Sequence, residues 1–402
     1  MNAACSSFIR LINGTELRFG EITLPASKSE SNRALMIAAY GGFTADFQNL
    51  SDSNDTRVLA NALREIENKN PVIDIADCGT AARFLATYLA CHNGEWMLTG
   101  TERMKQRPIQ PLVEALLAFG SDIQFVEKEG FLPIHIYGKP IQGGKVAVSM
   151  TQSSQFVSSL LLAAPGFPQG LELELVGELN SLPYLEMTLS MMRHFCAEVE
   201  RSGRIVIVNP RPYQSKRFRV SPDWSAASYW YEMAAFSDAC EIKLRSLRMP
   251  KDQLCLQGDA VISEWMVPLG VGTFCDNDGI VLRKIPFEKR RLSFDFSQHP
   301  DLYPTMAATC AGLNVEATFS GLDNLAVKES DRVDAMQTEL AKLSQRPLRF
   351  CAHNDHRIVM ALAPLAILYG PATFDHLEVV QKSYPRFWED ASFLCHTNPL
   401  MG

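Results

Sequence analysis

Two carboxylates among several cations are the residues that could carry proton-transfer chemistry. Asp301 lies in a polar turn directly before an apolar stretch, where its carboxylate could be a helix cap or a general base. Glu329 lies between Lys328 and Arg332, where a structural ion pair explains it as well as a catalytic role does. Arginine binds carboxylates and phosphates through paired hydrogen bonds, and lysine adds a mobile charge that can transfer a proton. These residue types predict acid–base chemistry on an anionic substrate.

The cations as a set lie near the starts of apolar segments. They are Lys28, Arg33, Arg83, Arg107, Lys328, Arg332, Arg357 and Lys382. Lys328 and Arg332 are four residues apart and would share one face of a helix if that piece is helical. Lys382 follows a strand-like LEVVQK stretch. One such cation could be a solvated surface charge, but a set repeated at segment starts predicts an anion-binding site.

Other chemistries lack the motifs that they need. The sequence has neither GxGxxG nor a Walker-type loop, so nucleotide binding is not predicted. It has no GxSxG and no evident nucleophile–base pair, which argues against covalent hydrolysis. His353 and His356 could begin a metal site, but no third ligand is suitably spaced, and Asn354 to His356 fits a helix cap better. We therefore predict no metal and no cofactor.

Six polar-to-apolar segments are the elements that must position these residues. Polar side chains at the start of each segment predict a helix cap, and the apolar stretch rich in small residues predicts a helix buried on nearly every side. The segments are SKSESNRALMIAAY from Ser27, DCGTAARFLATYLA from Asp77, TQSSQFVSSLLLAAP from Thr151, DWSAASYWYEMAAF from Asp223, HPDLYPTMAATCAG from His299 and HNDHRIVMALAPLAIL from His353. If these partly positive helix ends converge, they form a strong anion site.

Alternating apolar and polar residues between these segments predict β-strands. The pieces are FLPIHIYG from Phe131, KVAVSM from Lys145, LELELVG from Leu171, RIVIVN from Arg204 and RRLSFDF from Arg290. Amphipathic second helices are expected near Pro111 and Met187. The repeated unit is therefore mixed α/β.

Composition limits the class of protein. A chain of 402 residues with 47% hydrophobic residues is an ordinary globular protein of about two or three domains. Its net charge of −7 argues against a nucleic-acid partner, which requires a basic surface. The ten cysteines are scattered without a CxxC pair, which favours reduced thiols in a cytoplasm. Apolar runs are too short for a membrane span, and the N-terminus lacks a signal-peptide pattern.

Seven motifs identify a resemblance to a known family. They are LPASKSESNRAL from Leu24, DCGTAARF from Asp77, MKQRPI from Met104, SSQFVSSLLLAAP from Ser153, NSLPYLEMT from Asn180, LAVKESDR from Leu325 and NDHRIVMAL from Asn354. In this order they resemble the signature of the EPSP synthases, the 3-phosphoshikimate 1-carboxyvinyltransferases of the shikimate pathway, which belong to the enolpyruvyl transferases. The resemblance extends from about residue 20 to about residue 385.

The resemblance implies a fold and a reaction. The fold has two similar domains, each of three βαβαββ repeats arranged as an inside-out α/β barrel, with the active site in the cleft between them. Residues 25–222 would form the first domain, and 1–24 with 223–402 the second. The implied reaction transfers the enolpyruvyl group of phosphoenolpyruvate to the 5-hydroxyl of shikimate 3-phosphate by addition and elimination. We expect a cytoplasmic monomer without cofactor, nucleic-acid or membrane partners.

The resemblance also implies roles for individual residues. Asp301 is the expected base toward the 5-hydroxyl, and Glu329 and Lys28 are candidates for proton delivery whose roles stay undivided. The implied shikimate 3-phosphate ligands are Lys28, Ser29, Arg33, Ser153, Ser154, Gln155, Ser181, Tyr184, Asp301, Asn324 and Lys328. The implied phosphoenolpyruvate ligands are Lys28, Gly79, Arg107, Gln155, Arg332, Arg357 and Lys382. Gln155 would stack on the shikimate ring, and Gly79 would leave room for the smaller substrate.

Three departures from the family pattern concern substrate affinity. Asp77 stands where many members have Asn, Ala26 replaces a common glycine, and the chain is shorter around residues 347–351. A carboxylate at Asp77 would repel an anionic substrate unless it is protonated, paired or only a helix cap.

Two alternatives stay open. One is the sister enzyme that transfers enolpyruvate to UDP-N-acetylglucosamine, but its mobile loop with a reactive Cys or Asp has no match here. The other is a non-catalytic anion-binding protein, against which the joint presence of Asp301, Glu329 and the cation set argues.

Overall fold

The chain forms two compact units. In the computed structural model, the described residues are 7–10, 16–44, 46–151, 153–249, 256–287, 290–392 and 396–398. One unit comprises Lys28–Val220, and we call it the middle unit. The other, the terminal unit, joins Met1–Ser27 to Ser221–Gly402.

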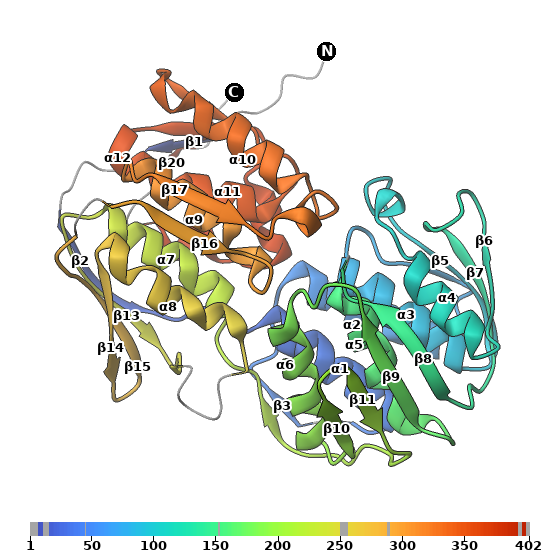
Figure 1. Ribbon diagram of the computed structural model, residues 1–402. Coiled ribbons are helices and arrows are strands. Elements are labelled where there is room, and N and C mark those ends of the chain that lie inside the picture. Colours follow the sequence, from blue (N-terminus) through green and yellow to red (C-terminus); the bar gives the residue numbers. More distant parts are fainter. Residues whose placement is uncertain are drawn as a thin grey trace. The chain divides into compact units, whose positions relative to one another are not determined.

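Four four-stranded sheets share one pairing pattern, in which a parallel pair is followed by two antiparallel pairs (Figure 1). The first, in the middle unit, is β4 (Val72–Asp74), β5 (Gly94–Thr99), β7 (Ile134–Gly138) and β6 (Asp122–Phe125). The second is β8 (Gly144–Ser149), β9 (Leu171–Val176), β11 (Ile205–Val208) and β10 (Val199–Ser202). The third, in the terminal unit, is β2 (Glu16–Ile22), β13 (Ala239–Arg245), β15 (Gly279–Lys284) and β14 (Val271–Asp276).

Two helices accompany each of these first three sheets. They are α3 (Gly79–Cys91) with α4 (Gln110–Ala118), α5 (Ser154–Ala163) with α6 (Leu182–His194), and α7 (Trp224–Phe236) with α8 (Ile262–Trp265). In chain order, β4-α3-β5-α4-β6-β7 and β8-α5-β9-α6-β10-β11 are both βαβαββ repeats. The predicted mixed α/β repeat is therefore confirmed.

The remaining elements form smaller or discontinuous repeats. The middle unit adds α1 (Lys28–Gly41), α2 (Asn54–Glu67) and the parallel pair β3 (Phe47–Gln48) and β12 (Phe218–Arg219). The terminal unit adds α9 (Tyr303–Gly312), α10 (Arg332–Leu340) and the parallel pair β16 (Leu292–Asp295) and β17 (Ala317–Ser320). Its last repeat has α11 (His356–Leu362), α12 (Ala366–Tyr369), α13 (Phe387–Asp390), and the fourth sheet, ordered β18 (Leu348–Phe350), β19 (Ala372–Phe374), β1 (Ser7–Arg10) and β20 (His396–Asn398).

The six polar-to-apolar segments all contain helices, and the predicted strand-like pieces contain β7, β8, β9, β11 and β16. Every α7 residue from Ala226 to Phe236 is buried, which agrees with the prediction of an internal helix. In α1, by contrast, burial is concentrated between Glu30 and Ile37, so its last turn lies nearer the surface than predicted.

Polar caps start several helices, but neither Asp77 nor Asp301, for which capping was one alternative, is a cap. Ser153, Asp223 and Asp355 each accept a hydrogen bond from a backbone N–H in the first turn of the helix that follows. The α3 cap is the thiol of Cys78 rather than Asp77, because Cys78 is the extended residue immediately before the helix. Asp301 lies within a 3₁₀ turn, Pro300–Leu302, that precedes α9, so its carboxylate does not cap that helix.

Two other local predictions are corrected. Lys328 is not on a helix with Arg332, because α10 begins at Arg332, where Asp331 accepts the Val333 and Asp334 N–H groups. The LEVVQK stretch is not a strand, because Glu378–Lys382 forms a 3₁₀ helix. A short apolar run has too few residues to distinguish a strand from a helical turn.

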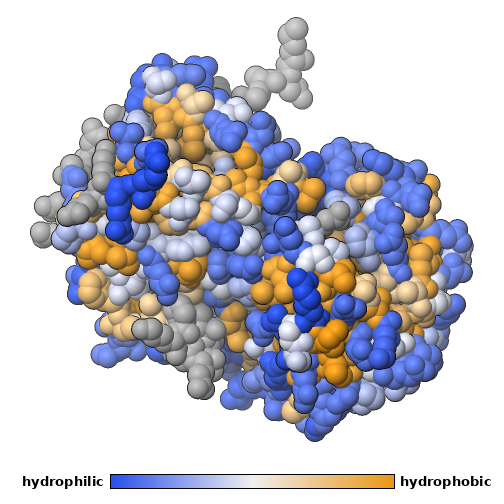
Figure 2. All heavy atoms as spheres, in the orientation of Figure 1, coloured by the Kyte–Doolittle hydropathy of each residue, from blue (hydrophilic) through white to orange (hydrophobic). Residues whose placement is uncertain are grey.

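The surface is mixed in polarity. Figure 2 shows polar and apolar side chains interspersed on the visible face. Ile207 and Phe274 are exposed apolar residues on strands. Within the described ranges, no helix is long and apolar enough to cross a membrane.

Candidate active site

Arg332 organises a carboxylate cluster in the terminal unit. Its Nη1 donates to Asp301 Oδ1 at 2.9 Å, and its Nη2 donates to Glu329 Oε2 at 2.8 Å. Its Nε donates to Asp355 Oδ2, also at 2.8 Å. Burial alone would lower the pKa of Arg332, but the nearby Asp355, Glu329 and Asp301 carboxylates raise it above its ordinary value. Two predicted catalytic carboxylates are therefore held by one buried guanidinium.

Asp301 bridges two arginines. Its second oxygen, Oδ2, accepts a hydrogen bond from Arg357 Nη2 at 2.7 Å. Arg357 is in the first turn of α11 and is buried. Because each oxygen of Asp301 has a charged donor, the carboxylate has a fixed orientation.

Asp355, predicted as part of a helix cap, also binds a buried arginine in the structure. It caps α11 by accepting the Arg357 N–H, and it also binds Arg332 and the Ser330 hydroxyl. Its position directly after Asn354 in the NDHR motif is the signal that could have identified it. Asp355 thus links the helix that carries Arg357 to the helix that begins with Arg332.

The other predicted residues of the terminal unit lie on neighbouring turns. Asn324 is in the 3₁₀ helix Asp323–Leu325, and its buried amide oxygen has no hydrogen-bond partner among the described residues. Lys328 is partly buried in the turn before α10, and Lys382 is buried at the end of Glu378–Lys382, which packs against α11. The buried amide oxygen of Asn324 is suited to accept a hydrogen bond from a ligand hydroxyl.

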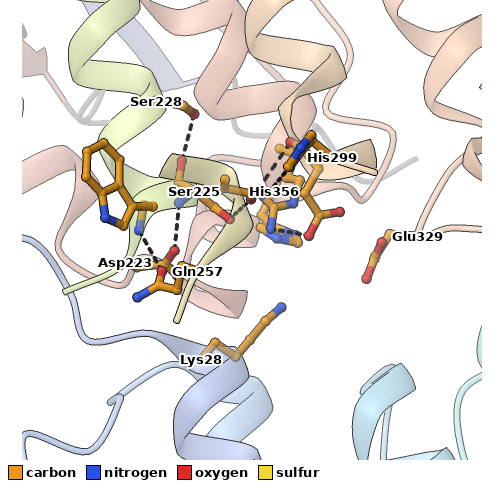
Figure 3. Close-up of polar contacts among 12 residues, drawn as sticks. Lys28, Asp223, Ser225, Ser228, Gln257, His299, Glu329 and His356 are labelled. Carbon is orange, nitrogen blue, oxygen red and sulfur yellow. Dashed lines mark hydrogen bonds and ion pairs between the residues drawn. The ribbon is translucent and has the colours of Figure 1, made fainter. Parts of the chain in front are cut away.

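A second polar network surrounds the start of α7 (Figure 3). Asp223 accepts the Ser225 N–H at 2.8 Å, and the Ser225 hydroxyl donates to Asp259. His299 Nδ1 lies 3.8 Å from the other Asp259 oxygen. Here the carboxylate stands between the hydroxyl and the imidazole, so this is no Ser–His nucleophile pair. At 3.8 Å the contact between His299 and Asp259 is longer than a hydrogen bond, although His299 precedes Asp301 by only two residues.

Lys28 begins α1 in the middle unit and is paired with a carboxylate that the sequence analysis did not identify. Its Nζ lies 2.9 Å from Asp55 Oδ2, and Asp55 is buried in the first turn of α2. Ser29, the next residue of α1, offers its backbone carbonyl to Arg33 Nη1 at 3.0 Å. The polar SDSNDT run around Asp55 was the available signal for this partner.

Arg33 is enclosed by polar groups of three helices. Its guanidinium donates to Thr188 Oγ1 at 2.8 Å and, through Nη2, to Ser158 Oγ and the Tyr184 carbonyl, both at 3.3 Å. Burial lowers the pKa of Arg33 to about 10. The predicted residues Arg33 and Tyr184 are thus brought together, and Arg33 fixes the first turn of α6.

Arg107 lies against the start of α3. A Cβ atom built on Gly79 would be only 2.6 Å from Arg107 Nη1. The absence of a side chain at Gly79 therefore lets the guanidinium approach the N-terminus of the helix. Positive charge from Arg107 and from the helix end is concentrated at this point.

Gln155 joins the starts of α3 and α5. Its Nε2 donates to Thr80 Oγ1 at 3.1 Å, and its backbone N–H donates to the capping hydroxyl of Ser153. Ser154 is buried as the first residue of α5. Ser181 precedes α6 with a φ of 58° and a buried side chain. The middle unit thus gathers four helix starts lined by predicted ligand residues.

The described residues can bind anions and move protons, and nothing in them suggests a metal centre. No group of three or more His, Cys, Asp or Glu side chains that could hold a metal occurs in these ranges. The structure places Asp301, Glu329, Arg332 and Arg357 in one cluster, and Gly79 with Arg107 in another.

Similarity to solved structures defines the class of fold. EPSP synthase from Acinetobacter baumannii matches with a TM-score of 0.74 at 20% identity, over 98% of this chain and 99% of that chain. The enolpyruvyl transferase NikO from Streptomyces tendae matches with a TM-score of 0.70 at 15% identity, over 98% of both chains. The chain therefore has the enolpyruvyl transferase fold, as predicted.

Sequence similarity then specifies the family. The family model described as EPSP synthase (3-phosphoshikimate 1-carboxyvinyltransferase) matches residues 13–71 and 64–391. The 3-phosphoshikimate 1-carboxyvinyltransferase of Bacteroides fragilis is 42% identical over 390 residues, covering 92% of this chain and 93% of the relative. That of Mannheimia succiniciproducens is 33% identical over 423 residues, covering 93% and 96%. The chain belongs to the EPSP synthase family.

Proposed function

We propose that this chain transfers the enolpyruvyl group of phosphoenolpyruvate to the 5-hydroxyl of shikimate 3-phosphate and releases phosphate. The product would be 5-enolpyruvylshikimate 3-phosphate, an intermediate of aromatic amino-acid biosynthesis. The observation that carries the proposal is the cluster in which Arg332 and Arg357 orient Asp301, with Glu329 bound to the same guanidinium. Family membership at 42% identity supports the choice of reaction.

The carboxylates suit the two proton transfers of this reaction. The 5-hydroxyl loses a proton as it attacks C2 of phosphoenolpyruvate, and C3 gains one. The tetrahedral intermediate then eliminates phosphate, for which C3 must give up a proton and the leaving phosphate must gain one. Asp301 would accept the hydroxyl proton, and Glu329 or Lys28 would deliver the proton to C3 or to the leaving phosphate.

The proposed shikimate 3-phosphate groove uses groups from both units. In the middle unit, its ligands are Lys28, Ser29, Arg33, Ser153, Ser154, Gln155, Ser181 and Tyr184. In the terminal unit, they are Asp301, Asn324 and Lys328. The serine hydroxyls, among them the Ser153 cap, and the buried amide oxygen of Asn324 would supply the neutral hydrogen bonds, and the cations would neutralise the phosphate. The Arg33 guanidinium already donates hydrogen bonds to groups on α5, on α6 and on its own helix, α1. Its main contribution would therefore be to hold Ser29 and Tyr184 in place.

The proposed phosphoenolpyruvate ligands are Lys28, Gly79, Arg107, Gln155, Arg332, Arg357 and Lys382. These cations would bind the carboxylate and phosphate and stabilise the charge of the tetrahedral intermediate. Gly79 supports this assignment because its lack of a side chain lets the Arg107 guanidinium approach the N-terminus of α3. Arg332 would act in two ways, as a ligand and as the group that orients Asp301 and Glu329.

We propose two domains, residues 25–222 and residues 1–24 with 223–402, and an active site between them, because the proposed ligands come from both. Closure of the domains on the substrates would exclude water and join the two sets. We further propose a cytoplasmic monomer that works without a cofactor. Scattered cysteines, such as the buried Cys78 and Cys310, are free thiols, which is consistent with a reducing compartment.

The deciding experiment measures phosphate released from phosphoenolpyruvate with each acceptor in turn. Shikimate 3-phosphate should support turnover, and UDP-N-acetylglucosamine should not. Turnover with the UDP-sugar alone would assign the chain to the sister reaction. Binding of phosphoenolpyruvate without turnover on either acceptor would indicate an anion-binding protein.

A further inference from the structure

A tight turn before α11 has an unusual backbone. The Asp355 N–H donates to the Ala352 carbonyl at 2.9 Å, and the two residues between them have positive φ, 50° at His353 and 51° at Asn354. Two consecutive residues in the left-handed region are typical of a type I′ turn, in which Gly, Asn and Asp predominate. Asn354 therefore suits its position, whereas His353 is the less usual residue, and the contacts around it can stabilise the turn.

The stabilising contacts come from a buried carboxylate at the far end of α10. Glu339 Oε1 lies 2.9 Å from His353 Nε2, and Glu339 Oε2 accepts the Cys351 N–H, also at 2.9 Å. Lys342 Nζ donates to the same Oε2 at 2.6 Å. Glu339 is fully buried, whereas the His353 side chain is 26% exposed. The ring of His353 is thus fastened to the helix that begins with Arg332.

A carboxylate on the other side of the turn adds support. Asp375 Oδ1 accepts the Ala352 N–H at 2.7 Å, and its Oδ2 lies 3.2 Å from the Cys351 thiol. The backbone of residues 351–352 is therefore held on both sides. His353 is the residue through which the left-handed part of the turn is attached.

The residue presented by this turn is Asp355. It accepts Arg332 Nε at 2.8 Å and the Arg357 N–H at 3.0 Å. The turn is consequently tied to α10 at two points, His353 to Glu339 and Asp355 to Arg332. Any shift of the turn would move Asp355 relative to the guanidinium that also binds Asp301 and Glu329.

We propose that His353, held by Glu339, is a positioning residue that sets the geometry of Asp355 and, through it, of Arg332 and Arg357. This goes beyond the proposed ligands, because His353 acts through the turn and needs no contact with substrate. It rests on the proposed function only for the choice of phosphoenolpyruvate as the anion that Arg332 and Arg357 bind.

The principal test is H353N, since asparagine tolerates left-handed φ but cannot reach Glu339 as histidine does. The KM for phosphoenolpyruvate should rise about tenfold, because small displacements of binding groups are costly. The KM for shikimate 3-phosphate should change by less than about twofold, whereas kcat should fall about threefold or more, because Arg332 also orients Asp301 and Glu329. H353Q, whose amide N–H can still donate to Glu339, should recover most of the loss.

A matched control removes a histidine–carboxylate contact elsewhere. His135 Nε2 lies 3.1 Å from Glu95 Oε1 in the middle unit, and H135N should leave both KM values unchanged. If H353N does not fold, H353G takes its place, because glycine adopts left-handed φ without strain and has no ring to reach Glu339. The same selective rise in the KM for phosphoenolpyruvate is expected from H353G.

Crystal structures of the wild-type chain and of H353N provide a readout that does not depend on turnover. The contact between Asp355 Oδ2 and Arg332 Nε, 2.8 Å here, should lengthen or break in H353N. An unchanged contact, an unchanged KM for phosphoenolpyruvate in folded H353N, or an equal rise in both KM values would overturn the proposal. If the wild-type chain lacks enolpyruvyl transfer, the proposed function fails, and the crystal structures alone decide the role of His353.

Discussion

At the scale of the residue, Arg332 explains how carboxylates that repel each other share one site. Its three hydrogen-bonding nitrogens bind Asp301, Glu329 and Asp355, and it is almost completely buried. A guanidinium suits this position because its planar fork donates in several fixed directions, which an ammonium group cannot reproduce. The orientation of both proposed proton-transfer groups therefore depends on a single side chain.

Glu329→Gln should preserve the site and impair the chemistry. Glutamine can still accept from Arg332, so substrate binding should stay within about twofold of the wild type, while kcat falls by a factor on the order of 10² or more because proton transfer is lost. Steady-state kinetics and calorimetric binding separate these effects. Glu264→Gln, an exposed change on α8, is the control. Unchanged kcat would remove Glu329 from the mechanism.

Gly79→Ala should weaken phosphoenolpyruvate binding selectively. The new Cβ would lie 2.6 Å from Arg107 Nη1, so the flexible guanidinium must move away from the helix end. We expect the KM for phosphoenolpyruvate to rise on the order of tenfold, with little loss of stability. Gly166→Ala is the matched control, since its Cβ would meet nothing within 4 Å. Equal effects of the two substitutions on KM would contradict the assignment of Arg107.

At the scale of the element, the proposed ligands are concentrated at the starts of helices. Ser153 caps α5 and Asp355 caps α11, and each cap is adjacent to proposed ligands. In α3 the same position is occupied by Cys78, a weak hydrogen-bonding group. Repeats with common topology thus use different side chains as caps.

Replacing Cys78 tests whether its thiol caps α3. Sγ accepts the Ala81 N–H at 3.4 Å, so Cys78→Ala should lower the free energy of unfolding by about 1 kcal/mol. Cys78→Ser keeps an acceptor and should lose less. Urea denaturation of both variants measures the difference. Equal losses would show that the thiol contributes only volume.

At the scale of the whole molecule, each unit has its own set of sheets and helices. The terminal unit contains a buried acid that lowers the stability of the fold when it is ionised. Glu232 on α7 is completely buried, and neither carboxyl oxygen has a hydrogen-bond partner among the described residues. Burial raises the pKa of Glu232 well above its ordinary value. The folded state therefore holds this proton more tightly than the unfolded state does.

Glu232→Met should stabilise the protein, most strongly at high pH. In the wild type, the raised pKa of Glu232 makes the free energy of unfolding fall as pH rises above the ordinary glutamate range. The variant lacks this loss and should gain about 1–3 kcal/mol by removing an unsatisfied buried group. Denaturation at about pH 5 and at about pH 8 measures how the free energy of unfolding changes with pH. The control Glu264→Met, at an exposed position, should leave the pH dependence of the free energy of unfolding unchanged. The same pH dependence in Glu232→Met as in the wild type would refute the prediction.

Local order along the chain was readable from the sequence. Period-two alternation located strands such as β9 and β11, and polar starts located helices such as α5 and α7, because backbone hydrogen bonding and side-chain periodicity act over a few residues. The order of the motifs alone indicates the EPSP synthase family, and the comparisons confirm that resemblance.

Only the tertiary structure decided which charged groups meet. Arg332 reaches Asp301 across 31 residues of sequence, and Arg357 reaches it across 56. These pairings depend on how whole elements pack, which short-range patterns do not encode. The sequence therefore left Asp301 open between cap and base, whereas packing excluded the cap. Packing also separated Lys328 from the helix of Arg332 and gave His353 a buried carboxylate as its partner.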